Sequence, residues 1–525
     1  MSKNYLLASS QGSGKSVWLD NLAVKYARAG KKVLIAVPTG NLAMDHQKRI
    51  IKQGEKPYVL MSHKNLFGKL NPGFTCPYAY EIQSLSKLGV SNGCLKKEYC
   101  KNCDNEQVCP FPRQYARMLE VDSKIFICQH AHFTTTEIAK YLKQMQFDIM
   151  FIDEEFISSL LVHVKPTQLE KTLLKQFVGK VEWAERLYEW LCNGGYPKGF
   201  INAFEGELVS IKKYFEQHKA PWNIPEYIRL FKPENYMDKG IGLYIFHPLI
   251  DVPVRVFTDA TPPKEMLEIV LDTKDITTIG DNYVVDYQSL NKDSKIIQTV
   301  DGWVTKTKLQ APLDDQGLPT FGNMYKILDM IAKKAITVHP DKKILVTTYK
   351  QWRDKAHDWF TVNYPELLPR LDVNWMVAGS NAWEDFDVQF LVCGVYQNAK
   401  QMYTDVYKLK VIANYWNRQK GRPIVQNPYP FGISLKSNID REPKKLKRLL
   451  KVYNEGRVSE SPHFTCTVPT DYYFKIVEDL MIAKTQQAIR LRFKDSKPKT
   501  VYVLSNFFLP GFIITDNVMT EELYC

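Results

Sequence analysis

A glycine-rich loop near the start of the chain has the residue types of a phosphate-binding site. It lies between an apolar run, Tyr5–Ala8, and an amphipathic helical pattern, and it reads Ser9-Ser10-Gln11-Gly12-Ser13-Gly14-Lys15-Ser16. Glycine lets the backbone approach a phosphate closely, and backbone N–H groups at a helix N-terminus attract its charge. Lys15 would reach the β- and γ-phosphates of a nucleotide, and the Ser16 hydroxyl would bind Mg²⁺. The segment predicts a P-loop, and a flexible loop with the same letters is the alternative.

A pair of carboxylates follows a buried strand pattern further along the chain. Ile149–Ile152 leads directly into Asp153 and Glu154. On the same sheet as a P-loop, Asp153 can hold the Mg²⁺ shell and Glu154 can polarise an attacking water. An acidic helix N-cap is the structural alternative. Together with the P-loop, the pair predicts a Walker B site for nucleotide hydrolysis.

Half of the ten cysteines fall in one short window and have the spacing of metal ligands. They are Cys76, Cys94, Cys100, Cys103 and Cys109. Two residues separate the third from the fourth, and five separate the fourth from the fifth, which is tight enough for a single metal centre. Four thiolates suit Zn²⁺ or an iron–sulfur cluster, and the spacing does not distinguish them. We therefore predict a metal site that uses four of the five thiols.

The composition limits the class of protein that carries these motifs. A chain of 525 residues is too long for one compact core and predicts two to four domains. Hydrophobic residues at 45% and charged residues at 24% exclude a disordered or collagen-like chain. No apolar run reaches the roughly 18 residues of a membrane helix, and nothing at the N-terminus indicates secretion. We expect an intracellular protein, cytoplasmic or nucleoid-associated. The net charge of +13 favours a polyanionic partner such as nucleic acid.

The motifs resemble, in type and order, those of the iron–sulfur helicases of superfamily 2, the XPD/DinG type. The first-half segments that carry the resemblance, besides the P-loop, are Pro38–Gln47 with Thr39, Ser62–Leu66, Cys109–Arg117, Gln129–Phe133 with His130, Asp153–Phe156, and Thr258-Asp259-Ala260-Thr261. The chain departs from the family where Phe156 replaces a His, Asp259 a Ser and Ser9 a Gly. The comparison favours a 4Fe-4S cluster, with zinc as the runner-up.

Two segments in the second half extend the resemblance. Gly379-Ser380-Asn381 resembles motif V, a loop that couples nucleotide and DNA contacts, and Gln486, Arg490 and Arg492 have the spacing of motif VI. Arginine suits motif VI because its planar fork stays charged and can bind γ-phosphate oxygens. A basic helix face is the alternative for these arginines.

The fold class implied is α/β, with two RecA-like parallel-sheet lobes and two insertions in the first lobe, one cysteine-rich and one helical and arch-like. The boundaries that we expect are 1–60, 121–160 and 246–290 for the first lobe, 61–120 for the cysteine-rich iron–sulfur domain, 161–245 for the arch-like insertion, and 291–525 for the second lobe with an insertion at about 405–470. In that last insertion, Asn414–Arg418 combines aromatic and cationic side chains as in single-strand binding, although a solvated charged face has the same pattern.

The function implied is an ATP-dependent helicase or translocase on single-stranded DNA with 5′ to 3′ polarity. The expected ligands of ATP and Mg²⁺ are Gly12, Ser13, Gly14, Lys15, Ser16 and Asp153, and the expected catalytic residues are Lys15, Glu154, Gln486, Arg490 and Arg492. Coupling to DNA would involve Thr39, His130, Thr258, Thr261, Gly379, Ser380 and Asn381. The expected partners are single-stranded and forked DNA and replication or repair proteins, with no membrane. Two alternatives stay open: a nucleic-acid-binding regulator with an inactive nucleotide site, and another P-loop motor with a zinc module.

Overall fold

The computed structural model describes most of the chain between residues 2 and 504. The longest segments outside this description are residues 9–13, 62–75, 88–98, 165–173, 193–235, 280–293, 299–323, 376–382, 393–398, 426–444, 467–471, 481–496 and 505–525, and shorter gaps lie between them. Among the helices that are described, none is long and apolar enough to cross a membrane.

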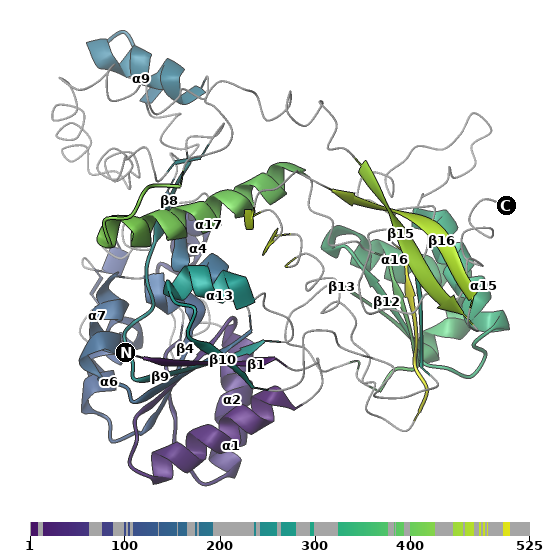
Figure 1. Ribbon diagram of the computed structural model, residues 1–525, viewed down its shortest axis with the longest axis horizontal. Helices are drawn as coiled ribbons and strands as arrows, with labels where there is room; N and C mark the ends of the chain where they lie inside the picture. The colour runs from purple at the N-terminus through teal and green to yellow at the C-terminus, as the bar shows by residue number, and fades with distance from the viewer. Residues whose placement is uncertain are drawn as a thin grey trace.

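Strands from the first half of the chain form one parallel sheet (Figure 1). Its seven strands have the order β10-β1-β9-β5-β2-β4-β3, and all neighbours run parallel. Their bounds are Lys3–Ala8 (β1), Val33–Val37 (β2), Tyr58–Val59 (β3), Ile125–Gln129 (β4), Ile149–Asp153 (β5), Val254–Asp259 (β9) and Ile276–Ile279 (β10). Every residue of β2 and β5 is buried, as expected for a parallel sheet covered on both faces.

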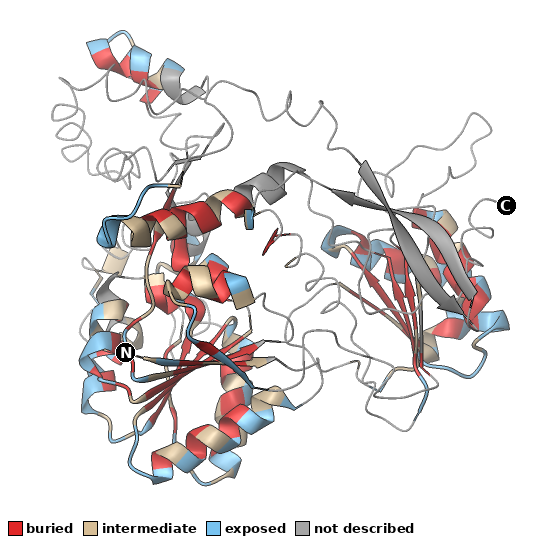
Figure 2. Ribbon diagram, in the orientation of Figure 1, coloured by how far each residue is buried: buried red, intermediate tan, exposed pale blue. Residues whose placement is uncertain are grey.

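Alternating residues of these strands pack against two different sets of helices. Val33 and Ile35 share a core with α1 (Lys15–Arg28) and α2 (Gly40–Lys52). Leu34 and Ala36 belong to a second core on the opposite face. The helices of that face are α6 (Pro110–Glu120), α7 (Thr136–Gln144) and α13 (Lys264–Leu271). Figure 2 shows the buried strands between the two helical layers. The sheet is therefore the middle layer of three.

Strands from the second half form another parallel sheet, of five strands in the order β11-β17-β14-β12-β13. Their bounds are Lys295–Gln298 (β11), Ile344–Thr348 (β12), Leu371–Trp375 (β13), Val388–Leu391 (β14) and Thr500–Val503 (β17). Helices α15 (Met324–Thr337) and α16 (Lys350–Asn363) cover one face with a core of their own. Two separate parallel sheets confirm the α/β class and are consistent with two RecA-like lobes.

Smaller elements lie between and beside the two sheets. They are α4 (Ala79–Lys87), η2 (His130–Thr134), η3 (Ile157–Leu160), β6 (Leu161–Val164), α9 (Glu182–Cys192), β7 (Tyr236–Met237), β8 (Gly242–Phe246), η6 (Pro365–Arg370), β15 (Lys445–Asn454) and β16 (Arg457–Cys466). Strands β6, β8 and β7 form an antiparallel sheet, and β15 pairs with β16. The expected arch-like region thus contains strands as well as helix α9, and both insertions stay predictions.

Helix α17 (Ala399–Gln419) follows the second sheet's strand β14 but packs on the first half of the chain (Figure 1). Its Trp416 Nε1 donates a hydrogen bond to Val270 O at 3.0 Å. The rings of Tyr415 and Trp416 lie edge-on to Phe246, at 5.2 and 6.1 Å. The sequence left single-strand binding and a solvated charged face open for this segment, and the structure uses these two aromatic residues in packing between elements.

Ion pairs connect Asp272, directly after α13, with Lys420 and Arg422, directly after α17. Asp272 accepts a hydrogen bond from Arg422 Nη2 at 2.5 Å and lies 2.5 Å from Lys420 Nζ. Burial would raise the pKa of Asp272, but the bonds and charges of the two cations outweigh it and lower the pKa. A carboxyl group with a lowered pKa stabilises the fold above its ordinary value near 3.9, and the contribution is lost as the pH falls through the lowered value.

Asp272→Asn tests this contact, because asparagine keeps the shape of the side chain and tolerates the residue's left-handed φ of 50°. We expect a loss of about 0.5–1 kcal/mol of stability at pH 7, measured as a lower melting temperature. The difference from wild type should shrink below about pH 3.9, where the carboxyl group is protonated. Asp122→Asn, at a side chain that is 98% exposed, is the control and should leave the melting temperature unchanged.

Candidate active site

The carboxyl ends of β1, β5 and β9 meet at one edge of the first sheet, where open α/β sheets bind ligands. Strand β9 lies between β1 and β5, and its Thr258 is in register with both Leu7 and Asp153. The loop that follows β1 leads into α1. The sheet order therefore brings the expected P-loop and the expected Walker B residue together from positions far apart in the chain.

The first turn of α1 has the backbone that a phosphate loop needs. Gly14 is its N-cap, with φ 84° and ψ 17°, and no side chain caps the helix. This left-handed conformation costs glycine little and residues with a Cβ much more. Lys15 and Ser16 follow as the first helical residues, while Gly12 and Ser13 lie outside the described residues. The uncapped N–H groups of this turn are suited to bind an anion.

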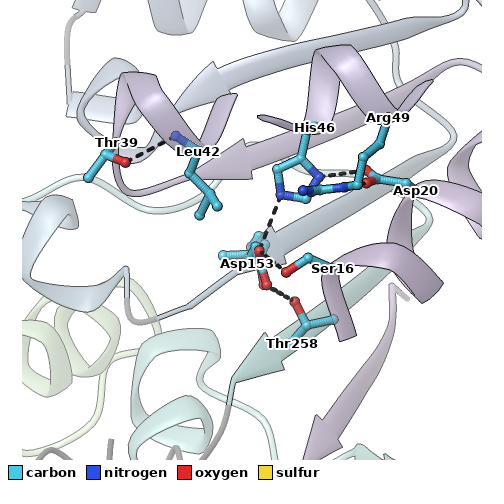
Figure 3. A network of polar contacts seen from close by, with 9 residues as sticks. Ser16, Asp20, Thr39, Leu42, His46, Arg49, Asp153 and Thr258 are labelled. Carbon is cyan, nitrogen blue, oxygen red and sulfur yellow. Dashed lines mark hydrogen bonds and ion pairs between the residues drawn. The ribbon is translucent and has the colours of Figure 1, made fainter. Parts of the chain in front are cut away.

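Asp153 is the centre of a hydrogen-bond network at this edge (Figure 3). Ser16 Oγ donates to Asp153 Oδ2 at 3.1 Å, and Thr258 Oγ1 donates to Asp153 Oδ1 at 2.6 Å. Only 1% of Asp153 is exposed. A hydroxyl and a carboxylate side by side are the hard oxygen ligands that Mg²⁺ prefers, so the donor set fits this ion.

Three residues of the network were missed by the sequence analysis. His46 Nε2 lies 3.3 Å from Asp153 Oδ2, and His46 Nδ1 lies 2.5 Å from Asp20 Oδ1. Arg49 Nε donates to the other oxygen of Asp20. The side chains of His46 and Asp20 are fully buried. One signal existed in the sequence, because Asp20 comes one helical turn after Ser16 and Arg49 three residues after His46.

The network shifts the pKa values of the two groups at its centre, His46 and Asp153. Burial would lower the pKa of His46, but its hydrogen bonds with Asp153 and Asp20 outweigh burial and raise the pKa. Burial would raise the pKa of Asp153, but the hydrogen bond and charge of His46 outweigh it, and the two hydroxyls add to the effect. The pKa of Asp153 is therefore lowered, and the carboxylate stays ionised although it is buried.

Glu154 has an unusual backbone conformation for a residue with a side chain. Its φ is 61°, in the left-handed region, and its backbone N–H donates to Thr258 O at 2.8 Å. Such conformations cost free energy and are concentrated at functional sites. The bend turns the chain away from β5 directly after Asp153.

Aromatic packing follows the acidic pair. Phe156 stacks on Phe257 with ring centroids 5.3 Å apart, and its edge meets His130 at 6.2 Å. Phe156 is 3% exposed and His130 1%. The acidic motif, β9 and η2 are thus connected through rings.

Thr39, which was expected to contribute to DNA coupling, is the N-cap of α2, and its hydroxyl accepts a hydrogen bond from Leu42 N at 3.3 Å.

Several expected site residues lie outside the described part of the chain. They are Cys94, Thr261, Gly379, Ser380, Asn381, Gln486, Arg490 and Arg492. Their roles stay predictions.

Four of the five clustered cysteines are described, and all four are partly buried: Cys76, Cys100, Cys103 and Cys109. Burial raises the pKa of Cys76, and Cys109 and Cys103 raise it further through their charge. Burial and the charge of Cys103 likewise raise the pKa of Cys109. Three thiols thus lie within electrostatic reach of one another. Within the described residues, however, no three or more His, Cys, Asp or Glu side chains have the geometry of a metal site.

Comparison with solved structures yields distant likenesses. No family model matches the chain, and no curated protein matches it. A solved XPD helicase is similar over 96% of this chain and 92% of its own, with 12% identity and a TM-score of 0.44. A hypothetical ATP-dependent RNA helicase from Sulfolobus tokodaii is similar over 80% of this chain and 90% of its own, with 12% identity and a TM-score of 0.24. A DEAD box protein from Methanococcus jannaschii covers 78% of each chain, with 10% identity and a TM-score of 0.28.

Thr258→Val tests the support of Asp153, because valine has nearly the shape of threonine but cannot donate a hydrogen bond. We expect a loss of about 1–3 kcal/mol of stability, since a buried carboxylate oxygen loses its partner. Chemical unfolding measures the change. Thr258→Ser keeps the hydroxyl and should retain most of the stability, and equal losses in both variants would show that packing alone matters at this position.

Proposed function

We propose that the protein is an ATP-dependent helicase or translocase that moves on single-stranded DNA. The observation that carries the proposal is the contact of Ser16 with Asp153 at the carboxyl edge of a parallel sheet, with Ser16 two residues after the left-handed Gly14. This combination of a helix N-terminus, a hydroxyl and a buried carboxylate suits a nucleotide with its Mg²⁺.

The residues of the first sheet would divide the work of hydrolysis. Lys15, with the backbone of Gly12 and Gly14, would bind the phosphates, and Ser16 and Asp153 would hold Mg²⁺. The bound ion would neutralise charge that develops on the phosphate oxygens. Glu154 would orient the attacking water. The left-handed backbone of Glu154 supports this role, because such conformations are concentrated at functional sites.

The second sheet would complete the site. Arg490, with Arg492 and Gln486, would approach the γ-phosphate, and arginine is suited to stabilise charge there. Gly379, Ser380 and Asn381 would couple this movement to DNA. The two separate parallel sheets support a mechanism in which the nucleotide biases two arrangements of the lobes.

Nucleic acid is the partner that the charge of the chain favours, with 70 basic and 57 acidic residues. Thr39, His130, Thr258 and Thr261 would couple the strand to the nucleotide. The direct contact of Thr258 with Asp153, and the ring contact of His130 with Phe156, support such coupling. DNA as the substrate and 5′ to 3′ polarity rest on the resemblance of the motifs.

The clustered cysteines would hold a 4Fe-4S cluster in a rigid domain beside the duplex. The electrostatic contact among Cys76, Cys103 and Cys109 supports a common site for these thiols. Soft thiolates suit iron–sulfur clusters and zinc alike, so measurement of the bound metal must decide between them.

Lys15→Ala is the direct test of the proposed activity. The variant should fold normally and lose ATP hydrolysis, because the phosphates lose their cation. ATP turnover and strand displacement on forked DNA and RNA, in both polarities, are the measurements. Lys25→Ala removes the same charge from an exposed position of α1 and should stay active. Undiminished turnover in Lys15→Ala would contradict the site, and a wild type that binds DNA without turnover would favour the regulator.

Cys109→Ser tests the metal site. Wild type purified without oxygen should contain iron and sulfide and absorb visible light, and the variant should lose both, because serine is a poor ligand for the cluster. Cys128→Ala removes a thiol buried in β4 and should retain the metal. A colourless wild type with stoichiometric zinc would show that the module binds zinc.

A further inference from the structure

The contacts around Asp153 form a closed ring. Ser16 Oγ and His46 Nε2 both contact Asp153 Oδ2, and His46 Nδ1 contacts Asp20 Oδ1. Asp20 comes four residues after Ser16 on α1, so one helical turn closes the ring. Figure 3 shows His46 between the two carboxylates. Helix α1 therefore contacts Asp153 twice, once through Ser16 and once through Asp20 and His46.

The ring is held from outside by Arg49. Its Nε donates to Asp20 Oδ2, the oxygen that His46 does not use, so both oxygens of Asp20 have a partner. The side chain of Arg49 is 30% exposed, whereas those of Asp20 and His46 are fully buried. A buried carboxylate without partners is costly, which fixes Asp20 and, through it, the plane of the His46 ring.

The two oxygens of Asp153 are held in different ways. Thr258 holds Oδ1, and Ser16 and His46 share Oδ2. In the proposed function, the Ser16 hydroxyl would bind Mg²⁺ through an oxygen lone pair and could still donate its O–H to Asp153 Oδ2. Ser16 would then contact the ion as well as Oδ2, so His46 is the contact of Oδ2 that does not itself bind the ion, as Thr258 is for Oδ1.

We infer that His46, held by Asp20 and Arg49, is a positioning residue that fixes the Asp153 carboxylate for Mg²⁺. The inference rests on the proposed function and deepens it, because it extends the metal site to helix α2. Residues that orient a metal ligand from behind typically change metal affinity or activity by about 10–100-fold when they are lost.

The test compares His46→Phe with His46→Gln. Phenylalanine fills the space without a polar atom, and glutamine keeps one hydrogen bond to a carboxylate. The half-saturating Mg²⁺ concentration is measured for binding of a fluorescent ADP analogue and, separately, for ATP hydrolysis. We expect His46→Phe to raise this concentration by about 10–100-fold. Turnover at saturating Mg²⁺ should be largely recovered, and His46→Gln should restore part of the affinity.

Two further variants cover the case in which His46→Phe does not fold. Asp20→Asn keeps the shape but removes the charge that holds His46, and Arg49→Met loosens Asp20 from its exposed side. Both should raise the Mg²⁺ requirement in the same direction, the second more weakly. Ile50→Val is the matched control, since Ile50 is buried on α2 outside the ring. It should cost about 0.5–1.5 kcal/mol of stability without a change in Mg²⁺ requirement.

The outcomes separate this inference from the proposed function. If wild type binds and hydrolyses the nucleotide but the His46, Asp20 and Arg49 variants need no more Mg²⁺ than wild type, the positioning role is wrong and the proposed function stands. If His46→Phe and His46→Gln lose stability alike with no selective change in Mg²⁺ affinity, His46 is structural only. A wild type that shows no Mg²⁺-dependent binding of the nucleotide overturns both.

Discussion

The structure of the first lobe depends on the burial of one ionised carboxylate. Asp153 is 1% exposed, and an ionised carboxylate in such a place costs several kcal/mol unless it has partners. Its partners are Ser16, His46 and Thr258, which belong to α1, α2 and β9. Together they span more than two hundred residues of chain, and the strand order, with β9 between β1 and β5, brings Ser16 and Thr258 to Asp153. The residues that give the Asp153 carboxylate its hydrogen-bond partners are therefore the same residues that form the site.

The packing around the sheet explains how so distant a set is kept in register. Alternate residues of β2 enter two cores, one with α1 and α2 and the other with α6, α7 and α13. A slip by one residue would exchange the two faces, so the pattern fixes the register of the strands. Helix α17 extends the second core with Val406, Leu409 and Ile412, although it lies between β14 and β17 in the chain. The second half of the chain thus supplies part of the apolar surface that covers the first sheet.

The sequence predicted what is encoded locally and missed what is formed over distance. Gly14, Lys15 and Ser16 are adjacent, so their spacing alone indicated the helix N-terminus that the structure has. The contact between His46 and Asp20 joins two helices, and each residue alone has the pattern of an ordinary polar position. For the segment that contains Trp416 the sequence offered base stacking or a solvated charged face, and neither describes packing between elements. Its bond to Val270 is set by tertiary structure, which no local pattern reveals.

Two kinds of contact involve the acidic motif, hydrogen bonds at Asp153 and ring contacts at Phe156, and their physics differs. At Asp153 the contacts are hydrogen bonds with α1, α2 and β9, which depend steeply on distance and angle and therefore hold the carboxylate in one orientation. At Phe156 the contacts are between rings, since Phe156 stacks on Phe257 of β9 and meets His130 of η2. Ring contacts are less directional and tolerate small shifts. The histidine that contacts Asp153 is His46, from α2. Asp153 is therefore held by directional bonds from three elements, whereas Phe156 connects β9 and η2 by packing.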